Sequence, residues 1–204
     1  MKDTYYTIND VYEATFKDKG SKFIAIAYPI KSVDQAKLLV EQLRKDAQYR
    51  GACHFCFAYK LGIDNIIYRS SDDGEPSGTA GKPILNQIES FKLSDIIVIV
   101  IRFFGGTLLG TSGLINAYKQ ATIDCLTQVK IVEVIVRSNI SITFSYQIQS
   151  EIERMLKNYN IEYEEKNFDI QINYRIKIKS SEFNSLLETI RNSVIFNQIK
   201  IYEY

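Results

Sequence analysis

Several features that mark whole classes of protein are scarce or missing in this chain. It has no run of roughly 18 apolar residues, so we expect no helix that spans a membrane. Its first twenty residues, MKDTYYTINDVYEATFKDKG, lack the apolar core of an export signal. Cysteine is rare, with three in 204 residues. An odd number of cysteines in a chain without an export signal is typical of reduced thiols, so we expect a cytoplasmic protein.

An excess of charge of either sign is also missing. Lys and Arg together number 25, Asp and Glu number 24, and the formal net charge is +1. Strong non-specific binding of nucleic acid usually needs a polycation, so we do not expect it here, and only a local basic patch stays open. What is present is an ordinary globular composition, 46% hydrophobic and 24% charged, which is enough for a packed core.

Metal ligands are few, because the chain has a single histidine. His54 lies between Cys53 and Cys56 in the stretch ACHFCFAY. Residues three apart in a strand point to opposite faces, and the chain has too few Cys and His for a four-ligand site. We therefore expect no metal and no cofactor, a buried or half-buried strand histidine, and two inert thiols in an apolar strand.

The last third of the chain has the clearest periodicity. Alternating apolar residues predict strands in NISITFSY, IEYEE, QINYRIKIK and NQIKIYEY, and two helical stripes lie between them, at Ile148–Tyr159 and Phe183–Val194. The order βαββαβ is that of a ferredoxin-like unit, in which two helices cover one face of a four-stranded antiparallel sheet.

The other face of that sheet has two interpretations. RNA-recognition modules of this topology stack bases on aromatic residues of the sheet. Here the face offers mainly polar residues and the cations Arg175, Lys177 and Lys179, with Glu162 and Glu164 on the preceding strand. We favour cross-strand ion pairs on a solvated face over an RNA platform.

The first two thirds mix strands and helices. Strands are expected at 20–30, at 52–62 and 64–70, which form a hairpin through Gly62–Asn65, and at 95–104, which is apolar enough to be central. Helices are expected after Ser32, where Gln35 completes a capping box, after Lys82-Pro83, and from about Gly113. With a short linker near 136–139, the chain divides into domains 1–136 and 137–204.

A glycine-rich segment, RFFGGTLLGTSGLINAY at 102–118, joins the central strand to the last of these helices. Thr111 and Ser112 are natural N-caps, and free amides at a helix start favour an anion. The segment has neither GK[ST] nor GxGxxG, so neither a Walker loop nor a dinucleotide site is supported. An anion site and a tight turn both stay open.

An acidic loop, SSDDGEPSGTAGKPIL at 70–85, is the other unusual segment. Asp72, Asp73 and Glu75 could hold a divalent cation or act as acid and base, although the pattern is not an EF-hand. Acids in a loop rich in glycine and proline more often stay solvated or cap the next helix.

Together, SDDGEPSGTAGKPIL, RFFGGTLLGTSGLINAY and ACHFCFAY strongly resemble the IMPACT family, in particular its two-domain bacterial, YigZ-like branch. The resemblance covers the first domain and extends into the second. It implies an α+β protein. Its N-terminal domain would be like domain 2 of a small-subunit ribosomal protein, a left-handed βαβ fold, and its C-terminal domain would be like domain V of elongation factor G.

The resemblance also implies a link to translation, since eukaryotic relatives regulate translation by restraining a stress kinase. They use in part an additional N-terminal domain, so the kinase role is not carried over. Two positions depart from the family's G-G-L-V-R-A-Y pattern, with Ser112 in place of a glycine and Asn116 in place of an arginine. The lost arginine removes one charge-assisted phosphate contact.

We therefore expect a translation-associated regulatory or binding protein that contacts RNA, the ribosome or a translation factor through a cleft between the two glycine-rich segments. In that cleft Lys82, Arg102 and the amides near Gly113 would hold an anion. The alternatives are an enzyme acting on a phosphorylated small molecule and a protein-interaction module. The expected binding residues are His54, Arg69, Asp72, Asp73, Glu75, Thr79, Lys82, Arg102, Gly105, Gly106, Gly110, Gly113 and Tyr118. No catalytic group is assigned, and the oligomeric state is not predicted.

Overall fold

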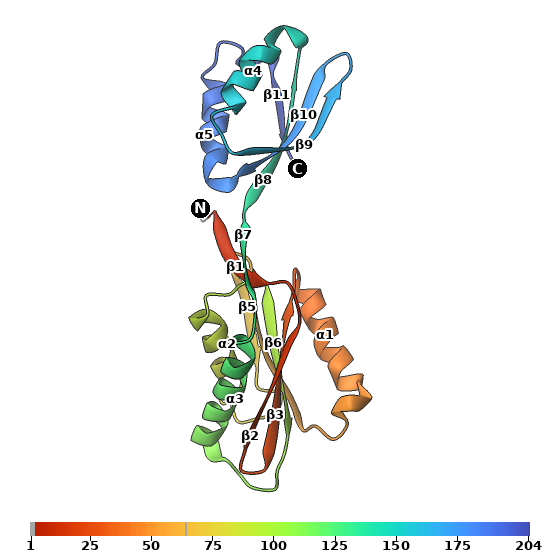
Figure 1. The fold of residues 1–204 in the computed structure, drawn as a ribbon, viewed down its shortest axis with the longest axis vertical. Helices are drawn as coiled ribbons and strands as arrows, with labels where there is room; N and C mark the ends of the chain where they lie inside the picture. Colours follow the sequence, from red (N-terminus) through yellow and green to blue (C-terminus); the bar gives the residue numbers. More distant parts are fainter. Residues whose placement is uncertain (1–2, 64) are drawn as a thin grey trace. The chain divides into compact units, whose positions relative to one another are not determined.

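The computed structural model describes residues 3–63 and 65–204, which form two compact units. One unit comprises the described residues of 5–134, and the other comprises 135–204 together with residues 3 and 4. The protein is α+β, as predicted, with helices packed on antiparallel sheets (Figure 1).

The N-terminal unit is built on a five-stranded sheet in the order β2-β3-β6-β4-β5, in which all neighbours are antiparallel. Its elements are β1 (Thr4–Ile8), β2 (Tyr12–Asp18), β3 (Ser21–Pro29), α1 (Val33–Lys45), β4 (His54–Leu61), β5 (Ile67–Ser71), α2 (Gly81–Ser90), β6 (Ile96–Phe103), α3 (Gly110–Leu126) and β7 (Ile131–Ile135). β1 and β7 form a separate two-stranded sheet. The strands β3 and β4 are parallel to each other because both are antiparallel to β6, and α1 connects them.

The apolar strand β6 is central and buried on both faces, as its sequence predicts. Ile97, Ile99 and Ile101 pack into a core with α1, while Val98 and Val100 pack into a second core with α2 and α3 (Figure 1). Because side chains alternate along a strand, Arg102 continues the row of Val98 and Val100 and lies on the face covered by α2 and α3.

Several predicted boundaries differ from the structure. The helix α3 begins at Gly110 rather than near Gly113, with the buried Leu109 as its N-cap residue and no side-chain cap, so the prediction of Thr111 and Ser112 as N-caps is wrong. The strands β1, β2 and β7 were not predicted, although Tyr12, Ala14 and Phe16 alternate in β2.

Two local predictions at the ends of elements are confirmed. At α1 the Ser32 hydroxyl accepts a hydrogen bond from the Gln35 amide, as the capping box predicts, and the Gln35 side chain accepts from the amide of Lys31. The hairpin of β4 and β5 is also present, and position 64 of its predicted turn lies outside the described residues.

The second unit has the predicted order βαββαβ. Its elements are β8 (Arg137–Phe144), α4 (Gln149–Leu156), β9 (Ile161–Phe168), β10 (Ile172–Lys179), α5 (Ser180–Arg191) and β11 (Lys200–Glu203). The sheet order is β11-β8-β10-β9, the ferredoxin-like arrangement. One core, which includes Phe144, Ile152, Tyr174 and Leu186, lies between the sheet and its two helices.

We predict that each unit folds alone, because each encloses its own hydrophobic core. Fragments 5–134 and 135–204, expressed separately, should each give a well-dispersed amide NMR spectrum that overlays on part of the whole chain's spectrum. A collapsed, poorly dispersed spectrum from 135–204 would show that the ferredoxin-like unit is not an independent domain.

Candidate functional site

The acidic loop between β5 and α2 is held in shape by Asp72. One carboxylate oxygen accepts hydrogen bonds from the amides of Ala80 and Gly81, at 3.0 and 2.8 Å, and the other accepts from Gly78 at 2.8 Å. Burial alone would raise the pKa of the Asp72 carboxyl, but these three amides hold it below the ordinary value. The Asp72 carboxylate therefore satisfies the free backbone amides at the start of α2.

Asp73 connects the same loop to the neighbouring strand. Its carboxylate accepts the amide of Phe55 at 2.6 Å and pairs with Arg44 of α1. Its backbone has φ of +46°, and its carbonyl oxygen lies 2.8 Å from Nδ1 of His54. The carboxylates of Asp72 and Asp73 thus both accept hydrogen bonds from backbone amides, and both are already engaged within the protein.

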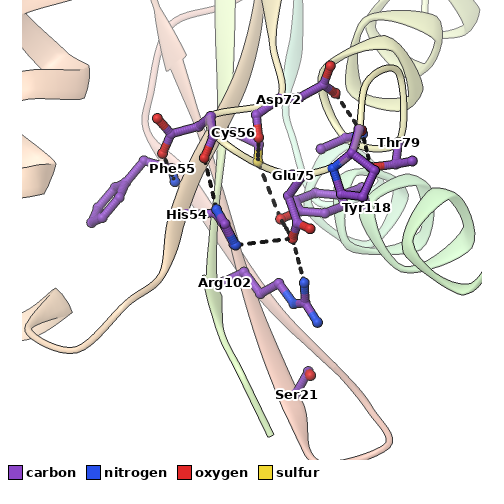
Figure 2. Close-up of polar contacts among 12 residues, drawn as sticks. Ser21, His54, Phe55, Cys56, Asp72, Glu75, Thr79, Arg102 and Tyr118 are labelled. Carbon is purple, nitrogen blue, oxygen red and sulfur yellow. Dashed lines mark hydrogen bonds and ion pairs between the residues drawn. The ribbon is translucent and has the colours of Figure 1, made fainter. Parts of the chain in front are cut away.

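Glu75 is the centre of a buried polar cluster (Figure 2). Its Oε1 accepts Nη1 of Arg102 at 2.5 Å and the hydroxyl of Tyr118 at 2.8 Å. The side chains of Glu75 and Arg102 are only 3% and 7% exposed. The expectation that Glu75 belongs to a solvated loop is wrong, because its side chain turns inward to neutralise a buried arginine.

Arg102 keeps part of its hydrogen-bonding capacity unused. Its guanidinium lies 5.5 Å from the ring of Phe23 and 5.7 Å from that of Phe104. Among the described residues the guanidinium makes only one hydrogen bond, from Nη1 to Glu75, and Nε is buried without a partner. A buried donor left without an acceptor typically costs about 1–3 kcal/mol, so this edge of the guanidinium calls for a partner from outside the chain.

His54 faces Glu75 from the start of β4. Its Nε2 lies 3.9 Å from Oε1 of Glu75 (Figure 2). A neutral imidazole has one donor and one acceptor nitrogen, and the carbonyl of Asp73 can only accept, so Nδ1 carries the proton. The lone pair of the neutral ring is then on Nε2, which is directed at the cluster. The sequence-based expectation of a half-buried strand histidine agrees with its intermediate burial.

A pocket of about 410 Å³ opens beside this cluster. Its lining is mostly apolar and comes from β4, the acidic loop, β6 and the start of α3. The lining residues are Cys53, His54, Glu75, Pro76, Arg102, Phe104, Leu108, Leu109, Gly110, Thr111 and Leu114. The two glycine-rich segments therefore meet in one pocket, which is of a size typical for small ligands.

Two predicted cations lie elsewhere. Lys82 is exposed in the first turn of α2 and does not line the pocket. Arg69 pairs across the hairpin with Tyr59, and both residues line a different pocket beside α1. Because Tyr59 packs into the core under α1, Arg69 lies on the opposite face of the sheet from His54 and Arg102. The structure thus separates Lys82 and Arg69 from the site.

The remaining predicted residues are mostly structural. The buried Thr79 hydroxyl donates to the carbonyl of Pro76 at 2.6 Å.

At Gly105 a side chain is excluded, because its Cβ would lie 1.9 Å from the carbonyl carbon of Gly20. Gly106 and Gly110 have φ of +86° and +71° and form the turn into α3. Gly113 is the fourth residue of α3, so its own amide is paired within the helix, and the free amides near it are those of Gly110, Thr111 and Ser112.

The cysteines differ from one another. Cys56 is buried, and its Sγ lies 3.0 Å from the carbonyl of Asp72 and 3.3 Å from the Tyr118 hydroxyl. Burial raises the pKa of the Cys56 thiol far above its ordinary value, so Cys56 is inert as predicted. Cys53, however, precedes β4 and is exposed at the pocket, so its predicted place in an apolar strand is wrong.

Two kinds of feature are absent from the described residues. Over 3–63 and 65–204, no group of three or more His, Cys, Asp or Glu is arranged to hold a metal ion. In the same ranges no helix is both long and apolar enough to cross a membrane.

The family model and the relatives that match this chain all belong to one family. The sequence model of the Impact N-terminal domain matches residues 19–126. IMPACT family member YvyE of Bacillus subtilis (strain 168) is 29% identical over 188 residues, which is 92% of this chain and 86% of that protein. IMPACT family member YigZ of Escherichia coli (strain K12) is 43% identical over 102 residues, which is 49% of each.

One of two solved structures compared with this chain agrees with it on the fold. One described as a hypothetical protein covers 100% of this chain and 98% of its own, with a TM-score of 0.67 and 23% identity. The two-domain translational regulator Yih1 is 28% identical over 61% of this chain and 47% of its own, with a TM-score of 0.39. That TM-score is too low for the likeness to Yih1 to support a structural conclusion.

We predict that Glu75→Gln strongly destabilises the protein. The substitution keeps the shape but leaves Arg102 as an uncompensated buried charge, which typically costs about 3–5 kcal/mol. As a control, Asp34→Asn breaks the exposed pair of Asp34 and Lys37 and should cost less than about 1 kcal/mol. Urea unfolding of the fragment 5–134 measures both, and equal losses would contradict the central role of Glu75.

We also predict an acid-dependent contribution from Asp72. A carboxyl whose pKa is lowered on folding stabilises the folded protein fully at pH values above the ordinary carboxyl pKa of 3.8. This stabilisation is lost as the pH falls through the lower pKa of the folded state. Asp72→Asn should therefore lower stability at pH 7 by about 1.5–3 kcal/mol, with the difference from wild type shrinking below pH 3.8. Urea unfolding of wild type and Asp72→Asn at pH 7 and below pH 3.8 tests this. A stability difference between the two proteins that does not change with pH would contradict it.

Proposed function

Because the chain belongs to the IMPACT family, we propose that it is a translation-associated regulatory protein that contacts RNA through the pocket of its N-terminal unit. The family link to translation is supported by a relative, Yih1, whose description is that of a translational regulator. The working compartment would be the cytoplasm, where RNA and ribosomes are found.

The observation that carries RNA as the ligand is the pairing of Phe104 with Arg102 at the pocket. Phe104 is 48% exposed, and its ring lies 5.7 Å from the Arg102 guanidinium. Proteins recognise unpaired bases by stacking them on aromatic rings or arginine planes, and such stacking needs no large positive charge. A near-neutral chain can therefore bind single-stranded RNA at one local site.

The start of α3 provides a complementary feature for the RNA backbone. Gly110 and Thr111 line the same pocket, and the first amides of a helix are free to bind an anion. A base beside Phe104 and a phosphate at α3 would use both parts of the pocket.

The sheet of the second unit is the poorer RNA surface. On its open face Arg175 pairs with Glu165 and Lys177 with Glu164, and the Tyr204 hydroxyl donates to Glu164. These contacts support the sequence-based preference for cross-strand ion pairs over an RNA platform.

An enzyme acting on a phosphorylated small molecule is the second candidate, and one observation favours it. In its neutral form His54 carries its lone pair on Nε2, and the residue lines the pocket, where a general base would be needed. Against it, Glu75 is already bonded to Arg102 and Tyr118, and the Cys56 thiol stays protonated. A third candidate, a protein-interaction module, predicts no RNA binding at all.

We predict that Phe104→Ala weakens binding of a fluorescent single-stranded RNA of mixed sequence. Loss of one base–aromatic stack typically costs about 1–3 kcal/mol, or roughly five- to a hundred-fold in affinity. The matched control is Tyr202→Ala, which removes an exposed ring from the sheet of the second unit. Fluorescence anisotropy measures both variants. Equal effects, or no binding by wild type, would reject the pocket as an RNA site.

A further inference from the structure

The geometry points to a more specific ligand, and we propose that the pocket receives a terminal phosphate monoester. This group is found at the end of an RNA strand and on a free nucleoside monophosphate. The inference deepens the proposed function and rests on it for RNA, but binding of the phosphate itself can be tested without RNA.

The first support is the free edge of Arg102. Since Nη1 is bonded to Glu75, the edge formed by Nε and Nη2 has no protein partner among the described residues. Two adjacent N–H groups on one arginine edge match two oxygens of a phosphate or carboxylate in a bidentate pair. The side chain is 7% exposed and lines the pocket, so a ligand would approach this edge from the pocket, and the buried Nε has to be uncovered by a shift of the guanidinium.

The second support is the start of α3, which lines the same pocket. This helix has 17 residues, and no side chain caps its N-terminus. The amides of Leu109, Gly110, Thr111 and Ser112 are thus without partners in the helix, and the helix dipole favours a negative charge there. Arg102 and α3 form two separate sets of donors around one space, so the ligand must offer more than two acceptor oxygens.

A terminal phosphate satisfies this requirement best. A phosphate monoester has three terminal oxygens, which allows two on the arginine edge and one on the helix amides. An internal phosphodiester has two, and a carboxylate has two in one plane. Because Glu75 already neutralises Arg102, the pocket selects by the placement of hydrogen-bond donors rather than by net charge.

The third support is the unequal burial of the residues that line the pocket. Arg102, Leu109 and Leu114 are buried, whereas Phe104 and Leu108 are 48% and 83% exposed. An internal phosphate that reached the buried Arg102 would have to bring in the chain on both of its sides. A chain end enters alone, with its base left beside Phe104.

The direct test compares 5′-AMP, adenosine and benzoate by isothermal titration calorimetry with the whole chain. We expect 5′-AMP to bind at least about tenfold more tightly than either competitor, because adenosine makes none of the charge-assisted hydrogen bonds and benzoate can make only those of the arginine edge. Arg102→Lys keeps the charge that pairs with Glu75 but lacks the second edge, so it should weaken 5′-AMP roughly ten- to a hundred-fold and leave adenosine unchanged.

Two more variants keep the test decisive. Thr111→Asp places a negative charge at the exposed start of α3 and should also weaken binding of 5′-AMP. If circular dichroism shows that Arg102→Lys does not fold, the result with Thr111→Asp decides the test. Lys82→Ala removes an exposed cation outside the pocket and should have no effect. Equal binding of 5′-AMP and adenosine, equal binding of benzoate, or normal binding of 5′-AMP by both pocket variants would overturn the inference.

Ten-residue RNAs with a 5′-phosphate, a 3′-phosphate or hydroxyls at both ends separate this inference from the proposed function. Tighter binding of either phosphorylated strand supports both and identifies the end that is bound. Equal binding of all three RNAs, lost in Phe104→Ala, rejects the terminal phosphate and keeps RNA as the ligand. Binding of 5′-AMP that depends on Arg102, without binding of any RNA, keeps the phosphate site and rejects RNA. If neither 5′-AMP nor RNA binds, both proposals fail.

Discussion

The buried ion pair of Glu75 and Arg102 is the interaction on which the site depends. It joins the acidic loop to the end of β6, and the Tyr118 hydroxyl attaches α3 to the same carboxylate oxygen. Removing two charges from water is costly, and a buried pair typically adds little net stability compared with apolar residues of the same shape. What it provides is position, since three elements far apart in the sequence must meet in one geometry for either charge to be compensated.

Much of the fold follows from patterns in the sequence. The nearly continuous apolar run of β6 predicted a central strand, and strict alternation in β10 predicted the sheet of the second unit. The strands β1, β2 and β7 were missed, because short strands with mixed burial carry a weak periodic signal. The start of α3 was misplaced because Thr111 and Ser112 are good caps by type, while the burial of Leu109 fixed the actual start.

The site was only partly predictable. The two glycine-rich segments, 70–85 and 102–118, both contribute residues to one pocket, but the partners of their charged side chains were not predicted. An acid in a loop such as Glu75 is usually solvated, and nothing local predicts that it reaches an arginine 27 positions later. One signal was available. Arg102 follows Val98 and Val100 on the face of β6 that α2 and α3 cover. A buried cation in that row must be paired with an acid or bound to a ligand. The location of Arg69 on the other face could have been inferred from the same alternation.

The hydrogen bonds of Asp3 have a consequence for the order in which the protein forms. Asp3 accepts from the amide and hydroxyl of Ser181, 178 positions later in the chain. At roughly 5–20 residues per second, a ribosome makes the second partner about 9–36 s after the first. The N-terminal unit is complete at Val134, 47 positions before Ser181, so it has about 2–9 s of that interval in which to fold. Asp3 therefore stays without these partners until Ser181 has been made.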